Sequence, residues 1–165
     1  VVICQHMPAG FTRSFAERLD RLARLEVREA EDGDRVRPGR VLVAPGGERH
    51  LRVKRWGGEY RVQLVEGDPV SGHRPSVDVL FASLAAAAGA NVAAAILTGM
   101  GSDGAEGMLQ LKRAGARCFG QNEASCVVYG MPGVAAGKGA VEAELDLEEI
   151  PQALLSAVVQ RFSSY

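Results

Sequence analysis

The sequence predicts a doubly wound α/β domain with a mostly parallel sheet, helices on both faces and one antiparallel hairpin insert. Apolar runs of strand length alternate with segments of helical periodicity along most of the chain. The apolar run at residues 92–97 stops at a glycine-dense turn, and Met108 and Leu111 follow at helical spacing. Two alternating runs, 50–55 and 59–65, are joined by a Trp-Gly-Gly turn, which predicts the hairpin.

The remaining elements follow from the same patterns, beginning with a buried parallel strand at residues 1–5. Thr12 is the expected N-cap of the first helix, whose apolar face is Phe11, Phe15, Leu19 and Leu22. Ser76 starts a second helix, and a closing helix is marked by Ile150, Leu154, Val158 and Phe162. Short strands are expected at 26–30, 40–44, 116–120 and 140–145, and residues 121–132 are expected to form a loop with short helical potential.

Size and composition are those of an ordinary globular domain, with 165 residues, 47% apolar and 24% charged. The net charge of -1 gives no reason to expect nucleic acid or an anionic membrane as partner. No apolar run approaches the roughly 20 residues that span a bilayer. Three scattered cysteines favour cytosolic thiols over a disulfide framework, so a cytoplasmic location is expected.

Two polar residues stand at the carboxyl ends of predicted parallel strands, where open α/β sheets bind ligands. His6 follows the first strand, and Asp103 lies in the turn after residues 92–97. A histidine can act as general base because its ordinary pKa is about 6.5. An aspartate that accepts from the ring N–H fixes the tautomer of that base. The structural alternatives are a capping histidine and a helix-start carboxylate favoured by the helix dipole.

The same turn also fits a second function. Residues 99–104, GMGSDG, match the dinucleotide fingerprint G-x-G-x-x-G, and Glu123 lies about 20 residues further on, where a ribose-binding acid is expected. Asp103, however, places a negative charge where a pyrophosphate would bind. Nucleotide binding is therefore the weaker hypothesis.

Two further stretches are candidates for substrate contacts. His73 and Arg74 precede a helix N-terminus, where a carboxyl or ester group can be met; the alternative is a solvated loop. Residues 121–126, QNEASC, either line the same cleft or form a polar loop over the sheet edge. The cysteines and histidines lack recognised zinc spacing, so neither a metal nor another cofactor is expected.

These motifs together resemble the catalytic domain of the chemotaxis protein-glutamate methylesterase family, CheB. The matching stretches run in order from the first residues almost to the closing helix. They are QHMP at 5–8, GFT at 10–12, FA at 15–16, RL at 18–19, EAEDG at 29–33, APG at 44–46, HRPSVDVLF at 73–81, LTGMG at 97–101, DGA at 103–105, QNEASCVV at 121–128 and GMP at 130–132.

The resemblance implies one catalytic domain over residues 1–165 and a Ser-His-Asp triad. The implied reactions are hydrolysis of glutamate methyl esters on chemoreceptors and deamidation of receptor glutamines. His6 would be the base, Asp103 would orient it, and the backbone N–H of Met100 would be an oxyanion donor. The implied partners are the cytoplasmic helices of methyl-accepting chemoreceptors and, in the complete protein, a receiver domain.

The sequence departs from the family pattern at the nucleophile. In the family, the serine lies before the histidine in a Gly-Ala-Ser-Thr-Gly-Gly turn, and no serine precedes His6 here. We therefore expect a catalytic domain that is incomplete at its N-terminus and has no receiver domain. Residues 1–165 alone should be nearly inactive, because loss of a triad nucleophile can cost on the order of 10⁶ in kcat. A homologue that binds receptors without turnover is the alternative hypothesis.

Overall fold

The computed structural model describes residues 1–162, which form two compact units. The first unit is Val1–Ser83, and the second begins at Leu84. Within the described residues, the strands pair into three sheets of three strands each, two parallel and one antiparallel. The predicted α/β class with mostly parallel strands and a hairpin is confirmed. The parallel strands form two sheets, one in each unit, where the sequence analysis expected one.

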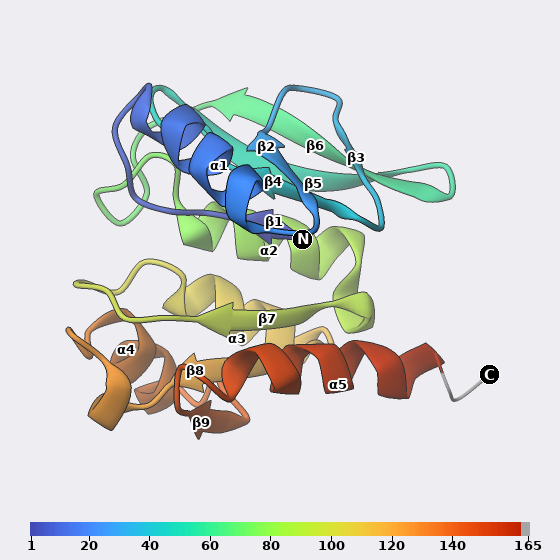
Figure 1. The fold of residues 1–165 in the computed structure, drawn as a ribbon. Helices are drawn as coiled ribbons and strands as arrows, with labels where there is room; N and C mark the ends of the chain where they lie inside the picture. Colours follow the sequence, from blue (N-terminus) through green and yellow to red (C-terminus); the bar gives the residue numbers. More distant parts are fainter. Residues whose placement is uncertain (163–165) are drawn as a thin grey trace. The chain divides into compact units, whose positions relative to one another are not determined.

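The parallel sheet of the first unit has the order β1 (Val2–Ile3), β4 (Arg40–Val43) and β2 (Glu26–Glu29). Helix α1 (Phe11–Leu22) lies along this sheet (Figure 1). Ala16 of the helix packs against Val27, Val41 and Val43 of the strands, and Ile3, Phe15 and Leu19 flank this core. The β1–α1 connection therefore ends in a buried contact, which holds the loop between them at the carboxyl end of β1.

Helix α1 differs from its prediction at both ends. Phe11 is 63% exposed and Leu22 is 75% exposed, so neither belongs to the buried face. The N-cap is Gly10, at φ +83°, and not Thr12. Glycine takes this backbone conformation without strain, so the helix begins two residues earlier than a Thr12 cap requires. Thr12 is wholly buried, and its hydroxyl forms hydrogen bonds with Glu29 and the Gly46 N–H instead of capping the helix.

The antiparallel sheet has the order β3 (Arg35–Val36), β6 (Glu59–Glu66) and β5 (Arg49–Trp56). The hairpin prediction is confirmed. Strand β3 was not predicted, because turn-forming residues lie on both sides of it. Helix α2 (Val77–Ala87) follows the hairpin. Its predicted start at Ser76 is confirmed, since the Ser76 hydroxyl accepts a hydrogen bond from the Val79 N–H at 3.4 Å.

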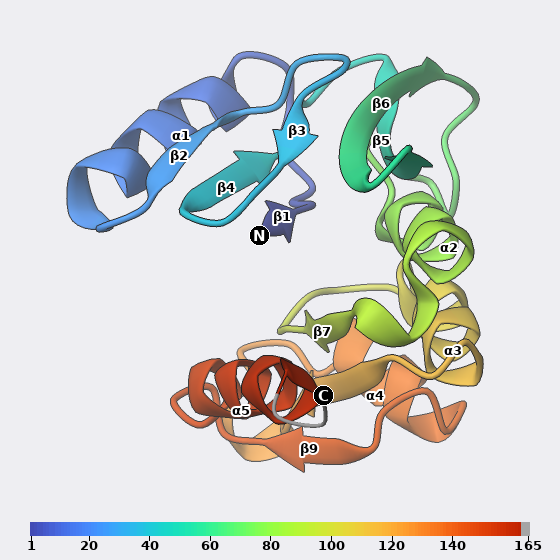
Figure 2. The ribbon, with the colours of Figure 1, turned by 90° about the vertical axis from the view of Figure 1, so that its right-hand side faces the viewer.

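The second unit is a parallel sheet in the order β7 (Ala93–Ile96), β8 (Arg117–Gln121) and β9 (Ala143–Leu145). Helix α5 (Ile150–Phe162) lies on one face, and α3 (Ala105–Arg113) and α4 (Met131–Gly137) lie on the other (Figure 2). The short helices are η1 (Gly89–Asn91) and η2 (Glu123–Ser125).

Helix α4 was not predicted, and its first turn holds Pro132, whose missing N–H costs nothing at a helix start. The helices in residues 1–162 are too short or too polar for any of them to cross a bilayer.

Candidate active site

His6 lies in the loop that follows β1 and stacks on a second histidine. The rings of His6 and His73 are nearly parallel, at 4°, with centroids 3.7 Å apart. Both side chains are half-buried. The first unit thus brings together two of the residues that the sequence singled out. A stacked neighbour restricts the tilt of the His6 ring.

The loop that carries His6 is held by a close approach of the turn after β4. A Cβ added at Gly46 would lie 2.3 Å from the Met7 carbonyl oxygen and 2.6 Å from that of Pro8. Only glycine permits this contact. The Gly46 N–H donates to the Thr12 hydroxyl at 2.9 Å, and that hydroxyl donates to Glu29 Oε1. The two loops are therefore fixed to each other beside His6.

Arg74 connects the turn after β4 to the loop after β6. Its Nε donates to the Gly47 carbonyl at 3.0 Å, and its Nη1 donates to the Gly67 carbonyl at 2.7 Å. These bonds hold the segment next to His73 in place. A role of Arg74 or His73 toward the substrate stays a prediction.

The third histidine, His50, has a structural task. It is 3% exposed, its Nε2 lies 2.9 Å from the Asp68 carbonyl oxygen, and its Nδ1 accepts the Ser76 N–H at 3.2 Å. Because Nδ1 accepts, the proton sits on Nε2 in this arrangement. His50 is thereby fixed on both sides in the core.

In the second unit, Asp103 occupies the turn between β7 and α3 and has no exposed surface. Gly101 and Gly104 flank it at φ +94° and +93°, which lets the chain fold its carboxylate inward. Gly104 is also the N-cap of α3, whose dipole favours a negative charge at this end. The position suits both an orienting carboxylate and a helix-start carboxylate.

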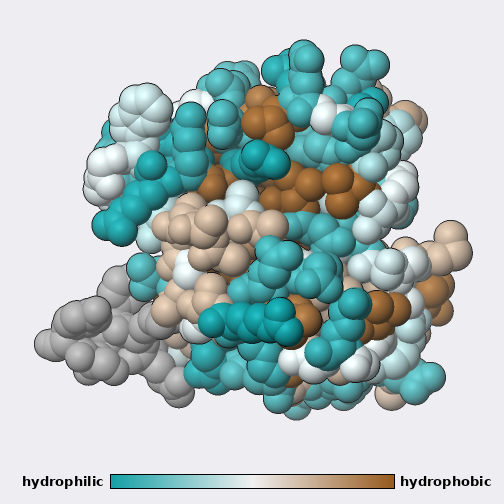
Figure 3. All heavy atoms as spheres, turned by 180° about the vertical axis from the view of Figure 1, so that it is seen from behind, coloured by the Kyte–Doolittle hydropathy of each residue, from teal (hydrophilic) through white to brown (hydrophobic). Residues whose placement is uncertain are grey.

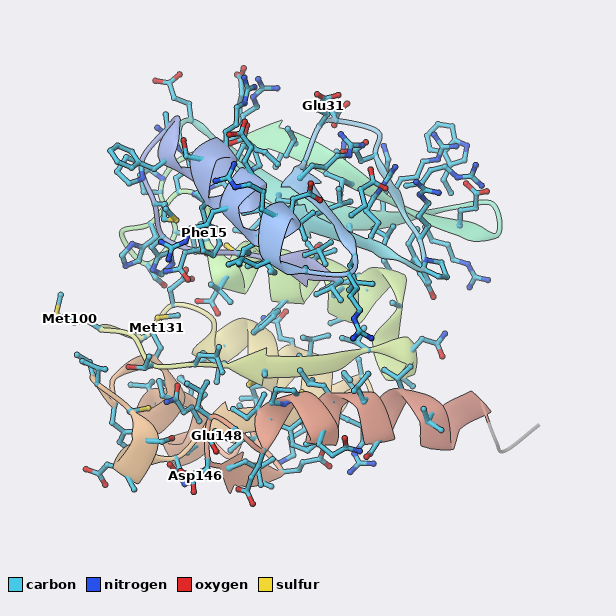
Figure 4. The ribbon with its side chains drawn as sticks, in the orientation of Figure 1. Phe15, Glu31, Met100, Met131, Asp146 and Glu148 are labelled. Carbon is cyan, nitrogen blue, oxygen red and sulfur yellow. The ribbon has the colours of Figure 1, made fainter. Side chains whose placement is uncertain are left out.

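Met100 stands in the same turn and is 82% exposed. Figure 4 shows its side chain extending outward from the loop tip, while Met131 lies against the fold. The Gly99 N–H donates to the Val128 carbonyl at 3.1 Å, and the Met131 N–H donates to the Gly99 carbonyl at 2.8 Å. These bonds fix the backbone on which Met100 sits, and its role as an oxyanion donor stays a prediction.

Gln121, at the end of β8, is a supporting residue that the sequence analysis did not single out. It is wholly buried, its Oε1 accepts the Thr98 N–H at 2.8 Å, and its Nε2 donates to the Ser125 carbonyl at 2.7 Å. The side chain therefore joins the start of the Met100 loop to the loop after β8. Gln121 is the first residue of the QNEASC motif, and this position could have indicated its importance.

Cys118 and Cys126 are poor candidates for a replacement nucleophile. Burial raises the pKa of the Cys118 thiol to about 11, and burial also raises the pKa of Cys126. Both therefore stay protonated at neutral pH, and the thiol is a far weaker nucleophile than the thiolate. Among residues 1–162, no three histidine, cysteine, aspartate or glutamate side chains are grouped as a metal site would require.

Comparison with known proteins decides the family of this chain. The family model described as CheB methylesterase matches residues 1–154. The chain belongs to the CheB methylesterase family. The family resemblance deduced from the motifs is thus confirmed, and it extends over nearly the whole chain.

Curated CheB relatives are named protein-glutamate methylesterase/protein-glutamine glutaminase. One from Bordetella parapertussis is 56% identical over 161 residues, and one from Pseudomonas aeruginosa, whose name carries the number 2, is 58% identical over 163 residues. These alignments cover 98% and 99% of this chain but 46% of each relative. The chain therefore spans a little under half the length of these relatives.

A solved CheB structure matches the fold as well. The Thermotoga maritima CheB methylesterase catalytic domain aligns with a TM-score of 0.90 and 39% identity. The alignment covers 94% of this chain and 82% of that domain. The pairing of His6 with Asp103 is not decided by these matches and stays a prediction.

Proposed function

We propose that residues 1–165 supply the base and the orienting carboxylate of a protein-glutamate methylesterase that also deamidates glutamines. The observation that carries the proposal is the CheB methylesterase match over residues 1–154, which includes both candidate residues. This family membership favours ester hydrolysis over the dinucleotide-binding hypothesis. The substrates are methylated glutamates on the cytoplasmic helices of chemoreceptors, and the reaction takes place in the cytoplasm.

The proposed mechanism is acyl transfer through a serine. In the family pattern the serine precedes the histidine, and we assign the attacking hydroxyl to a serine at that place. Serine attacks the γ-ester carbonyl while His6 accepts its proton, and His6 then protonates the methoxide oxygen, which departs as methanol. In the second half, water attacks the acyl-enzyme while His6 accepts its proton. His6 returns this proton to the serine oxygen as the acyl–oxygen bond breaks, which releases the glutamate carboxylate and regenerates serine. Deamidation follows the same course with ammonia as leaving group.

The remaining candidates have supporting roles in this proposal. Asp103 holds the His6 ring in one tautomer and stabilises the imidazolium. The Met100 backbone N–H donates to the oxyanion of the tetrahedral intermediate. His73 limits the tilt of the His6 ring through the observed stack, and no metal or organic cofactor takes part.

A chimera tests the proposal. Residues 1–165 replace the matching region of the Bordetella parapertussis relative, which provides the rest of the enzyme. The chimera should release methanol from methylated chemoreceptor, and His6→Ala in the chimera should abolish this release without lowering its melting temperature. Retained turnover in the His6→Ala chimera would refute the base assignment. Receptor binding without methanol release by the unsubstituted chimera would favour the receptor-binding hypothesis instead.

A further inference from the structure

The antiparallel sheet of the first unit carries a row of positive charges across its three strands. In the register of the sheet, Arg61 of β6 lies opposite Arg35 of β3 on one side and opposite Lys54 of β5 on the other. Directly opposite residues in antiparallel strands project from the same face. Three cations therefore lie abreast on one face of the sheet, in the hairpin region labelled β3, β5 and β6 in Figure 1.

Two more residues of β5 extend this face, because side chains two positions apart share a face of a strand. Arg52 and Trp56 flank Lys54 in this way, and both are exposed. The Lys54 Nζ lies 5.1 Å from the centroid of the Trp56 ring. We call Arg35, Arg52, Lys54, Trp56 and Arg61 the cationic face. The surface at the upper left of Figure 3, where the hairpin ends, is hydrophilic or intermediate in colour.

The cationic face has too few carboxylates for its charge. Glu59, opposite Trp56, forms ion pairs with both Arg35 and Arg61. Among the described residues, Arg52 and Lys54 form no ion pair within 4.0 Å. By contrast, Arg28, Arg37 and Arg40 of the neighbouring parallel sheet and its turns each form an ion pair.

The arrangement is unfavourable for the isolated protein. Like charges directly opposite each other destabilise a sheet. In addition, the Arg61 Nε is the one buried side-chain nitrogen or oxygen without a hydrogen-bond partner in the part of the chain that the structure describes. A buried donor without an acceptor is costly. An incoming anion would offset the repulsion between the opposite cations.

We propose that the cationic face binds a carboxylate-rich segment of a partner protein. The chain as a whole carries a net charge of -1, whereas nucleic-acid-binding domains are basic overall. Glu59 interrupts the row, which suits separate carboxylates better than a continuous phosphate backbone. Tryptophan and arginine are also enriched in protein interfaces. This binding requires neither the esterase activity nor its nucleophile.

Trp56 is the only tryptophan of the chain, so its fluorescence reports on the proposed site without a label. The probe is a synthetic helical peptide of glutamate and alanine, and the control peptide has glutamine at each glutamate. The glutamate peptide should change the Trp56 emission of the 165-residue chain saturably, and 0.5 M salt should reverse the change because it screens exposed charges. The glutamine peptide should have no effect.

A matched pair of variants locates the effect. Lys54→Gln should weaken peptide binding up to about fivefold, and its melting temperature should be unchanged or higher because a like-charge neighbour is removed. Arg55→Gln removes the same charge from the next residue, which is exposed but opposite Tyr60 on the other face of the strand. It should leave peptide affinity unchanged.

Three results would overturn the proposal. They are the absence of a saturable signal, equal binding of the glutamine peptide, and an equal loss of affinity in Arg55→Gln. A single-stranded oligonucleotide that binds more tightly than the glutamate peptide at 0.15 M salt would instead assign the face to nucleic acid. A lower melting temperature of Lys54→Gln would contradict the argument from like-charge pairs.

Discussion

The loops after β1 and after β7 carry the two candidate triad residues and are built differently. The loop after β1 presents His6 as a half-buried ring stacked on His73. The backbone of this loop is held by its close contact with Gly46. The loop after β7 hides Asp103 completely and is braced by hydrogen bonds from Thr98 and Gly99 to the next loop.

The difference matches the tasks proposed for the two residues. A general base has to meet the substrate and exchange protons, which requires partial exposure and a controlled ring plane. An orienting carboxylate acts through the base, and burial strengthens its electrostatic effect because the surrounding dielectric is low. The first loop is therefore expected to be sensitive to changes at the surface, and the second to changes in buried polar groups.

The largest expected effect belongs to the buried carboxylate. In the chimera, Asp103→Asn should lower kcat by about 10⁴ if the triad analogy holds, since the amide no longer fixes the productive tautomer. Methanol release from methylated receptor measures the change. The substitution is nearly isosteric, so circular dichroism should be unchanged. An unaltered rate would show that Asp103 takes no part in the mechanism. Its role would then be that of a carboxylate at the start of α3, favoured by the helix dipole.

The next effect concerns the first loop and its backbone contact. Gly46→Ala forces a methyl group against the Met7 and Pro8 carbonyls and should lower the free energy of unfolding by about 1–3 kcal/mol. The same change in the chimera should also lower kcat, because the His6 segment must shift. Denaturant titration and methanol release measure the two effects.

Gly58→Ala is the control for this substitution. Its added Cβ would have nothing within 4 Å, so stability should hardly change. Equal losses in the Gly46 and Gly58 variants would show that the close contact does not hold the loop.

For the loop after β7, the corresponding test is the buried amide of Gln121, which accepts from the Thr98 N–H at the start of that loop. Gln121→Leu leaves the Thr98 N–H and the Ser125 carbonyl without this partner and should cost about 1–3 kcal/mol of unfolding free energy. Gln110→Leu, at an exposed position of α3, should stay within about 0.5 kcal/mol. If the two variants melt alike, the polar network does not brace the Met100 loop.

The smallest effect concerns Tyr129, in the loop after β8. Its hydroxyl donates to Glu144, and this bond, more than burial, raises the pKa of Tyr129 to about 12. The folded state holds the phenol proton more tightly than the unfolded state, whose tyrosine pKa is about 10. The stabilisation is complete below pH 10 and is lost as the pH rises from 10 toward 12.

Tyrosinate absorbance measures this shift as the difference between the parent chain and Tyr129→Phe. The difference titration should have its midpoint near 12, and Glu144→Gln should move the midpoint toward 10. A midpoint that Glu144→Gln leaves unchanged would contradict the cause assigned to the shift.

Local patterns predicted the elements well where one residue type controls the outcome. Ser76 starts α2 as expected, and the Trp-Gly-Gly turn closes the hairpin. Helix periodicity failed at Phe11 and Leu22, because burial depends on how far the sheet extends beneath α1 and not on spacing. Strand β3 was missed because it is two residues long and its pairing with β6 bridges more than 20 positions of sequence.

The candidate residues could be predicted from the sequence, but the stacking and hydrogen bonds that hold them in place could not. His6 and Asp103 were found as polar residues at strand ends, whereas the stack of His6 on His73 joins positions 67 apart in the sequence. The hydrogen bonds of Thr12 to Glu29 and Gly46, and those of Gln121, are likewise long-range or depend on loop shape. No local propensity encodes them.

A double-mutant cycle in the chimera tests whether His6 and Asp103 act as one unit. Asp103→Asn should lower kcat about 10⁴-fold when His6 is present and less than about tenfold in the His6→Ala background, because residues of one catalytic unit are not additive. The readout is methanol released from methylated receptor in long incubations. The same large factor in both backgrounds would mean that the two residues act independently, and the proposed base and orienter would not be partners.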